Sequence, residues 1–295
     1  MRFVVATVLA IGSLLEPCAS QQADLEAELL TLEVLRQNPL RPELVNGQLY
    51  LIAQINSDAS AKALDKLIAK LPEKHRYIAI SALGLNESEE AAKALRRMAK
   101  DRGNLRVRRQ AVRVLANGDQ DDLDFLHSKR LKYESDLRVR ALILELLMNR
   151  GQPGLDKAFL TAAKSKDTVY AGVGLEGIGK HKIKIGLKII HSALAHKDLQ
   201  YRLAAYEALA SYGGERQYAT IIEGLQDSIN VVVLPKISAQ LQRAQTPDEV
   251  GAIISNCMRS KDLALVTICV EALVVISAKQ PQLCSDALLK LMSRS

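Results

Sequence analysis

The 295-residue chain is 48% hydrophobic, yet only 4% of it is aromatic, with three Phe and no Trp. A core of this composition consists of Leu, Ile, Val and Ala, which favours helix-on-helix packing over a β-sandwich. Eight Pro and 16 Gly are also too few for many short strands and tight turns. The formal net charge of +7 raises the question of an anionic partner.

The first 20 residues have the pattern of an export signal. Arg2 precedes an apolar run from Phe3 to Leu15, and the small residues around Cys18 suit cleavage. This run is shorter than the roughly 20 residues that span a bilayer as a helix. We therefore predict a signal peptide at 1–20, a mature chain at 21–295 without a transmembrane segment, and a periplasmic or secreted location. The alternative is that the apolar run forms a buried first helix.

An internal repeat of 31 to 32 residues covers most of the chain. The segment RRQAVRVLA from Arg108 returns in stronger copies from Arg76, Arg140, Ala171 and Arg202 and in weaker copies from Val45, Leu234 and Val266. Each copy has a small or moderate residue three positions after its start and an aliphatic residue seven positions after it. These positions share one face of an α-helix, so each copy predicts an amphipathic helix.

Capping residues and turn glycines delimit these helices. We expect helix N-caps at Asn104, Asp136, Asp167, Asp198 and Asp262. A second helical segment lies between successive copies, as in TPDEVGAIISNCM, where Thr246 and Glu249 form a capping box. Four glycines at the turns are expected to end helices in the left-handed conformation: Gly84, Gly118, Gly151 and Gly213.

Each repeat is thus a helix–turn–helix that buries its apolar face only by stacking on its neighbours. The motif R-x-x-A-[aliphatic]-x-x-[aliphatic]-Leu, with Asp shortly before the Arg, resembles the short HEAT-like repeat of phycobilin lyases and many other bacterial proteins. The resemblance covers roughly Ala23 to Ser293. It implies an all-α fold, a right-handed α-solenoid (alpha-alpha superhelix) of about eight HEAT-like helical pairs, and it leaves the function open.

The segment GVGLEGIGK, from Gly172, contains G-x-G-x-x-G and G-x-x-x-x-G-K, both typical of phosphate-binding loops. The repeat register instead places Gly174 and Gly177 in columns held elsewhere by Ala. His181 also stands where a phosphate loop needs Ser or Thr. We predict close helix packing or a local kink here, and no nucleotide site.

The sequence contains no His-Glu dipeptide, G-x-S-x-G elbow or Cys-x-x-Cys pair. We therefore expect no cofactor, no metal ion and no enzymatic activity, although a site assembled from distant residues stays an alternative. Cleavage of the signal would leave Cys257, Cys269 and Cys284. They either form one disulfide, whose pairing the sequence does not decide, or are small buried hydrophobic residues.

Charged residues supply the candidate binding surface. Basic residues concentrate between Lys93 and Arg113, where nine stand against the single acid Asp101. Five positions after the repeat starts, Glu145, Glu176 and Glu207 would form an acidic ladder on stacked helices. This ladder is either displayed to a partner or consists of helix-forming residues paired with Lys or Arg of the next repeat. Together, the candidate partner contacts on the concave face are Arg106, Arg109, Arg113, Arg138, Glu145, Glu176 and Glu207.

These features favour an exported, non-enzymatic scaffold that binds a protein partner through its concave surface. Two alternatives are a chaperone or lyase like the phycobilin lyases and a nucleic-acid-binding HEAT-like protein. The basic residues also suit an anionic surface or polymer. Nucleic acid is disfavoured by the export signal, the absence of Trp for base stacking and the glutamates on the same helix face.

Overall fold

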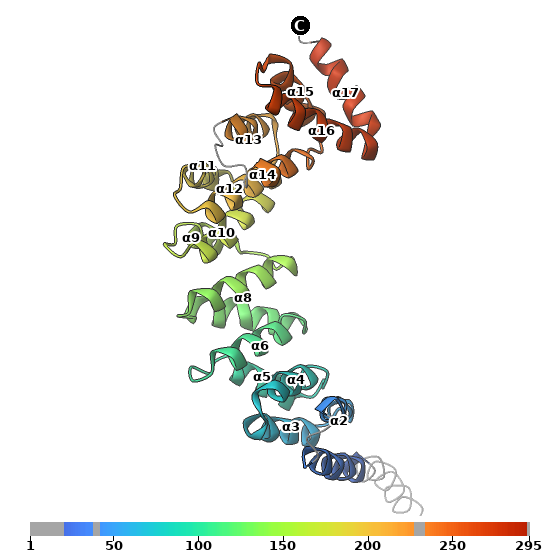
Figure 1. Cartoon of the computed structure of the whole chain (residues 1–295). Helices are drawn as coiled ribbons and strands as arrows, with labels where there is room; N and C mark the ends of the chain where they lie inside the picture. Colours follow the sequence, from blue (N-terminus) through green and yellow to red (C-terminus); the bar gives the residue numbers. More distant parts are fainter. Residues whose placement is uncertain (1–20, 38–41, 227–233, 294–295) are drawn as a thin grey trace, which may run out of the picture. The chain divides into compact units, whose positions relative to one another are not determined.

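The structure is a computed structural model of the chain that describes residues 21–37, 42–226 and 234–293 (Figure 1). These residues form helices joined by short turns, and they contain no β-strand. The predicted signal peptide at 1–20 lies outside the described residues. Within the described ranges, no helix is both long and apolar enough to cross a membrane.

Two compact units make up the chain. Unit 1 extends to Ser135 and includes Asn149–Gly151, and unit 2 comprises Asp136–Met148 and Gln152–Ser295. Each unit is an all-α stack of helical pairs, and each is described by itself below.

The repeat starts lie in eight helices, here called the motif helices. They are α2 (Pro42–Gln54), α4 (Glu73–Leu83), α6 (Leu105–Leu115), α8 (Leu137–Asn149), α10 (Thr168–Lys180), α12 (Leu199–Tyr212), α14 (Leu234–Leu241) and α16 (Leu263–Lys279).

The intervening segments are also helical and are here called the intervening helices. They are α3 (Asp58–Lys70), α5 (Glu89–Met98), α7 (Gln120–Phe125) with the π-helix η1 (Leu126–Leu131), α9 (Asp156–Ala162), η2 (Lys184–Gly186) with α11 (Leu187–Leu194), α13 (Glu215–Gln226) and α15 (Pro247–Arg259). A further helix covers residues 21–36, and α17 (Pro281–Met292) follows α16.

Packing follows the repeat in both units. In unit 1, α2, α4 and α6 form one layer, and α3, α5 and α7 form the other. In unit 2, α10, α12, α14 and α16 stack in one layer, while α13, α15 and α17 stack in the other. Motif helices also pack on the intervening helix that precedes them. Examples are α6 on α5 and α12 on α11. The predicted all-α solenoid is confirmed.

The repeat columns form the core. Seven positions after each start, the aliphatic side chains of Leu83, Leu115, Ile178 and Leu209 are all fully buried. Burying one such side chain contributes about 1.5–3 kcal/mol relative to leaving it in water. Leu273, in the last motif helix, is only partly buried.

The helix caps are confirmed. The side chain of Asn104 accepts backbone hydrogen bonds from Arg106 and Val107, and those of Asp136, Asp167, Asp198 and Asp262 cap α8, α10, α12 and α16 in the same manner. The capping box of Thr246 and Glu249 opens α15. Each cap satisfies amide groups that have no partner within the helix.

The turn glycines divide into two kinds. Gly151 (φ 67°) and Gly213 (φ 76°) adopt the left-handed conformation as predicted. The same prediction is wrong for Gly84, whose φ is −71°. A Cβ at Gly84 would lie under 3.0 Å from Val114 of α6, so close packing explains this glycine. Gly118 also lacks a positive φ.

The segment GVGLEGIGK lies within the continuous helix α10, as the repeat register predicts. A Cβ at Gly174 would lie under 3.0 Å from the backbone of Ala163, and one at Gly177 from the ring of Phe159. A Cβ at Gly179 would meet the backbone of Ala208 in α12 equally closely. These glycines therefore allow α10 to approach both neighbours.

Cys257, Cys269 and Cys284 are all free thiols in the structure. Cys269 is fully buried, and burial raises its pKa to about 11, with a smaller contribution from nearby Cys257. Cys269 thus packs as a small hydrophobic residue in the column that Ala occupies elsewhere.

Candidate protein-binding surface

The repeated arginine of the motif helices has a structural role. Arg76 donates to the carbonyl of Leu71 (3.1 Å), Arg108 to that of Asp101 (2.6 Å) and Arg202 to that of His196 (2.6 Å). Each carbonyl lies just after the preceding intervening helix, where carbonyl groups lack helical partners and a positive charge is favoured. These arginines are therefore excluded from the candidate surface.

The basic stretch of the third repeat is partly neutralised by carboxylates of adjacent repeats. Of its nine basic residues, four form ion pairs with residues 26 to 33 positions away: Arg96 with Asp122, Arg97 with Asp65, Arg106 with Glu73 and Arg108 with Glu134. Composition along the chain does not show these partners, because they come from the repeats before and after. The period of about 32 residues is the signal that could have revealed Asp65 and Glu73.

Arg106 lies at the start of α6 and is already engaged. Its guanidinium lies 2.6 Å from the Glu73 carboxylate at the start of α4, and Tyr77 donates to the same carboxylate. The hydrogen bond from Tyr77, followed by the bond and positive charge of Arg106, lowers the pKa of Glu73. The Arg106 side chain is nevertheless 70% exposed. It joins two stacked motif helices and stays accessible to solvent.

Arg106, Arg109 and Arg113 lie on one solvent-facing stripe of α6, here called the α6 stripe. Arg109 is half-buried, and its Nε has no hydrogen-bond partner among the described residues. Arg113 is exposed, and within the described part of the chain no carboxylate pairs with it. Between them, Gln110 donates to Ser81 of α4 at 2.8 Å, which fixes this stripe against the adjacent motif helix. The stripe therefore presents cationic groups from a rigid position.

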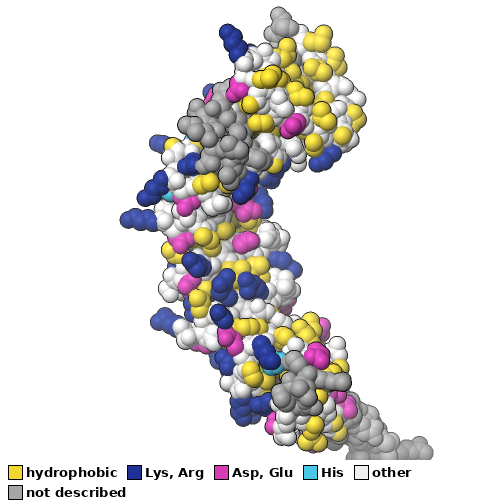
Figure 2. All heavy atoms as spheres, in the orientation of Figure 1, with side chains coloured by type: hydrophobic (Ala, Val, Ile, Leu, Met, Phe, Trp, Pro, Cys, Tyr) yellow, Lys and Arg dark blue, Asp and Glu magenta, His cyan; other side chains and the backbone are white. Residues whose placement is uncertain are grey.

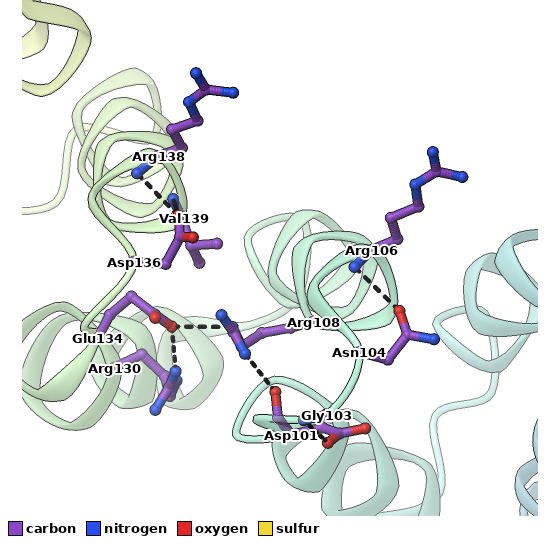
Figure 3. Close-up of polar contacts among 10 residues, drawn as sticks. All are labelled: Asp101, Gly103, Asn104, Arg106, Arg108, Arg130, Glu134, Asp136, Arg138 and Val139. Atoms are coloured by element: carbon purple, nitrogen blue, oxygen red, sulfur yellow. Dashed lines mark hydrogen bonds and ion pairs between the residues drawn. The ribbon is translucent and has the colours of Figure 1, made fainter.

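The remaining four candidates lie on motif helices of unit 2. Arg138 is exposed at the start of α8 and points away from its helix (Figure 3). Glu145 and Glu207 are exposed on α8 and α12. Glu176 lies 2.7 Å from Lys180 of its own helix, with both side chains 42% exposed. Pairing with the next repeat, one of the two interpretations of the ladder, is therefore wrong for Glu176.

A second feature of unit 2 is apolar. Figure 2 shows hydrophobic side chains gathered over the C-terminal helices, and the large exposed ones are Met258, Leu263, Val270, Val274, Leu288, Leu289 and Met292. They come from α15, α16 and α17. Unit 2 therefore exposes large apolar side chains on its last helices.

No cluster of three or more His, Cys, Asp or Glu residues suited to a metal ion occurs among the residues that the structure describes. The seven candidate residues divide between the two units. They occupy separate solvent-facing positions on α6 of unit 1 and on α8, α10 and α12 of unit 2.

A family comparison agrees with the repeat architecture over part of the chain. Residues 60–148 match the family described as HEAT repeats. Among solved structures, human deoxyhypusine hydroxylase in complex with glycerol aligns over 88% of this chain and 98% of its own, with 14% identity and a TM-score of 0.36. No curated protein matched the sequence. The helical pairs and the family match together support a HEAT-like repeat protein.

Proposed function

We propose that this protein is an exported, non-enzymatic scaffold that binds a protein partner through the solvent-facing side chains of its motif helices. HEAT repeats frequently serve as protein-interaction modules, and stacked repeats create long surfaces suited to that role. The proposed surface corresponds to the concave face of such a solenoid. Export rests on the pattern of residues 1–20.

The observation that carries the proposal is the stripe of α6. Four of the nine cations in this stretch pair with carboxylates of neighbouring repeats, whereas Arg109 and Arg113 have no carboxylate pairing with them in the described residues. Arginine is enriched where proteins bind one another because its planar group makes several directed hydrogen bonds. We expect this stripe to contact an acidic segment of the partner. In unit 2, Glu145, Glu176 and Glu207 with Arg138 would contact groups of complementary charge.

The test is the double reversal Arg109→Glu with Arg113→Glu, followed by capture of partners from an envelope extract. The matched control is Lys164→Glu with Lys166→Glu, which changes the net charge equally at two exposed positions of unit 2. Helicity and melting should be unchanged in both variants, because all four side chains reach solvent and no carboxylate pairs with any of them among the described residues.

The proposal predicts that the Arg109/Arg113 variant loses its partner while the control retains it. Equal capture by the wild type and the Arg109/Arg113 variant would exclude the α6 stripe as the binding surface. Equal loss in both variants would indicate an unspecific effect of net charge and would also count against it.

Export has its own test. Fractionation followed by sequencing of the mature N-terminus should give a protein outside the cytoplasm that starts near Gln21. A cytoplasmic chain that retains residues 1–20 would contradict export and would favour the alternative of a cytoplasmic chaperone or lyase.

A further inference from the structure

A strongly basic pocket lies within unit 1, away from the exposed stripe of α6. Its volume is about 580 Å³, and it is bounded by the turn after α5, by the buried side of α6 and by the π-helix η1 with the residues that follow it. Five cationic side chains line it: Lys100, Arg102, Arg108, Lys129 and Arg130. Glu134 is its one carboxylate, which leaves a formal surplus of four positive charges in the lining.

Two buried guanidinium groups share that single carboxylate. Arg108 and Arg130 both form ion pairs with Oε2 of Glu134, the first at 3.3 Å. Their side chains are 9% and 10% exposed, and that of Glu134 is 2% exposed. Figure 3 shows both arginines directed at the Glu134 carboxylate, with Arg108 also reaching the carbonyl of Asp101. One negative charge therefore serves two buried positive charges.

The hydrogen-bonding capacity of these arginines is not filled by the protein. The Nε of Arg130 has no hydrogen-bond partner among the described residues, and the Nε of Arg108 lies 3.3 Å from Oε2 of Glu134 without forming a hydrogen bond. Burial lowers the pKa of Arg130, and the charges of Arg108 and Arg102 lower it further, against the opposing effect of Glu134. The surroundings thus disfavour the positive charge that Arg130 retains. A second anion would relieve this imbalance.

The π-helix explains how one segment supplies so much of the lining. A π-turn inserts an extra residue into a helix, which shifts the face that the following side chains occupy, and such turns are frequent at functional sites. Two lining residues, Lys129 and Arg130, lie within η1, Phe125 directly precedes it, and Tyr133 and Glu134 follow within three residues of its end. Arg130 and Glu134 are thus buried members of the lining, while Lys129, Lys100 and Arg102 are its exposed cations, here called the cationic rim.

Aromatic rings complete the wall of the pocket. Lys100 Nζ lies 5.1 Å from the centre of the half-buried Phe125 ring, and Tyr133 is 64% exposed. A ring that already faces a cation helps to hold that cation in place. The pocket therefore combines a fixed cationic base, a cationic rim and an apolar wall. Its volume is in the range of small-molecule sites.

A neighbouring pocket of unit 1 provides a contrast. It has a similar volume, about 550 Å³, but Arg76, Arg97 and Lys100 in its lining are opposed by Asp65 and Asp101. The surplus of positive charge is therefore a property of the first pocket, here called the η1 pocket, and not of every pocket in this basic region.

We propose that the η1 pocket binds a small molecule through a phosphoryl group. A phosphoryl group carries up to two negative charges and several oxygens, which match two guanidinium groups and a cationic rim better than a single carboxylate does. This site is independent of the α6 stripe and of the proposed protein partner.

Calorimetric titration of the whole protein with inorganic pyrophosphate tests the proposal, with acetate as the carboxylate probe. We expect saturable binding of one pyrophosphate per chain and an affinity for acetate at least about tenfold weaker. The variant Arg102→Ser with Lys129→Ser removes two exposed rim charges and should weaken pyrophosphate binding by about tenfold or more.

The control is Lys164→Ser with Lys166→Ser, which removes the same charge in unit 2 and should leave the affinity within about twofold of the wild type. The absence of saturable pyrophosphate binding would overturn the proposal. So would equal weakening in both double variants, or acetate binding as tight as pyrophosphate. Because neither variant alters Arg109 or Arg113, failure here leaves the protein-binding proposal standing.

Discussion

The repeats around α6 in unit 1 and around α10 in unit 2 are joined by different means. In unit 1, arginines around α6 reach carboxylates of adjacent repeats, from Asp65 and Glu73 on one side to Asp122 and Glu134 on the other. In unit 2, α10 has glycines where α6 has larger residues, and its neighbours come into backbone contact. The same repeat can therefore be stacked through paired charges or through close approach.

This difference has functional consequences. Around α6, the paired arginines lie beside exposed cationic side chains, such as Arg113, that form no ion pair among the described residues. Both proposed binding sites on unit 1, the α6 stripe and the η1 pocket, combine arginines that pair with carboxylates and cations that do not. The unpaired ones among the described residues include Arg113 in the stripe and Arg102 in the pocket. The predictions below test the comparison, from the largest expected effect to the smallest.

The largest effect is expected for Glu134→Ala. Removing this buried carboxylate leaves Arg108 and Arg130 without their common partner, which costs about 3–5 kcal/mol of folding free energy. Hydrogen exchange should show the loss in peptides of unit 1, because repeats open locally. The triple variant Arg108→Met, Arg130→Met and Glu134→Leu should recover most of the stability, since it buries no unpaired charge. Full stability of Glu134→Ala would refute the stabilising role of the ion pairs that Glu134 forms with Arg108 and Arg130.

In unit 2 the corresponding change is Gly174→Ala. The new Cβ would lie under 3.0 Å from the backbone of Ala163, so α9 or α10 must shift, at a cost of about 1–3 kcal/mol. Gly172→Ala in the same helix is the matched control, because its nearest neighbour, Cβ of Ala204, is 3.7 Å away. The control should be neutral or more stable by up to about 1 kcal/mol. Thermal unfolding that gives both variants the same Tm would contradict close packing at Gly174.

The helix caps should not distinguish the units. Asn104→Ala in unit 1 and Asp198→Ala in unit 2 each remove a side chain that accepts a backbone hydrogen bond at a helix start. We expect each to cost about 1 kcal/mol, because the amide groups then depend on water alone. Denaturant titration of both variants measures this. A large difference between them would show that the cap of one unit has an additional role.

The smallest effect concerns pH and is confined to unit 1. Burial, with the charge of Lys74, lowers the pKa of His75, which lies 2.8 Å from Asn46. The unfolded chain then binds a proton more readily than the folded one. The contribution of neutral His75 to folding stability is therefore fully present above the ordinary histidine pKa of about 6.5. It is lost as the pH falls through 6.5 toward the lowered pKa of His75 in the folded protein.

His75→Gln should reduce the loss of stability between pH 7.5 and 5.5 that the wild type shows. Melting curves at both pH values, measured for the two proteins, provide the comparison. An identical pH dependence would mean that the folded environment of His75 does not disfavour its charge.

Much of the fold could be predicted from the sequence because the repeat is regular. The column of Ala111 and Leu115 predicted buried faces, and Asp167 and Asp198 predicted helix starts, since both depend on local chemistry. Gly84 was mispredicted because the local pattern cannot show that Val114, thirty positions away, packs against it. The partners of Arg96 and Arg97 were missed for the same reason.

The candidate surface could be predicted only in part from the sequence. The excess of basic residues near Arg109 was visible in the sequence. Its partial neutralisation by Asp65 and Asp122 was not, because it depends on how the repeats stack. The η1 pocket could not be foreseen, because hydrophobic periodicity does not indicate where a helix widens into a π-turn. Because the π-turn cannot be recognised in the sequence, neither can the placement of Arg130 beside Arg108.

The central claim is that α6 faces a protein partner. A photoreactive amino acid in place of Arg113 tests it most directly, with the same group in place of Lys164 as the control, followed by irradiation of intact cells. The account predicts one specific adduct of higher mass from position 113 and none from position 164. The same adducts from both positions, or no adduct from position 113, would contradict it.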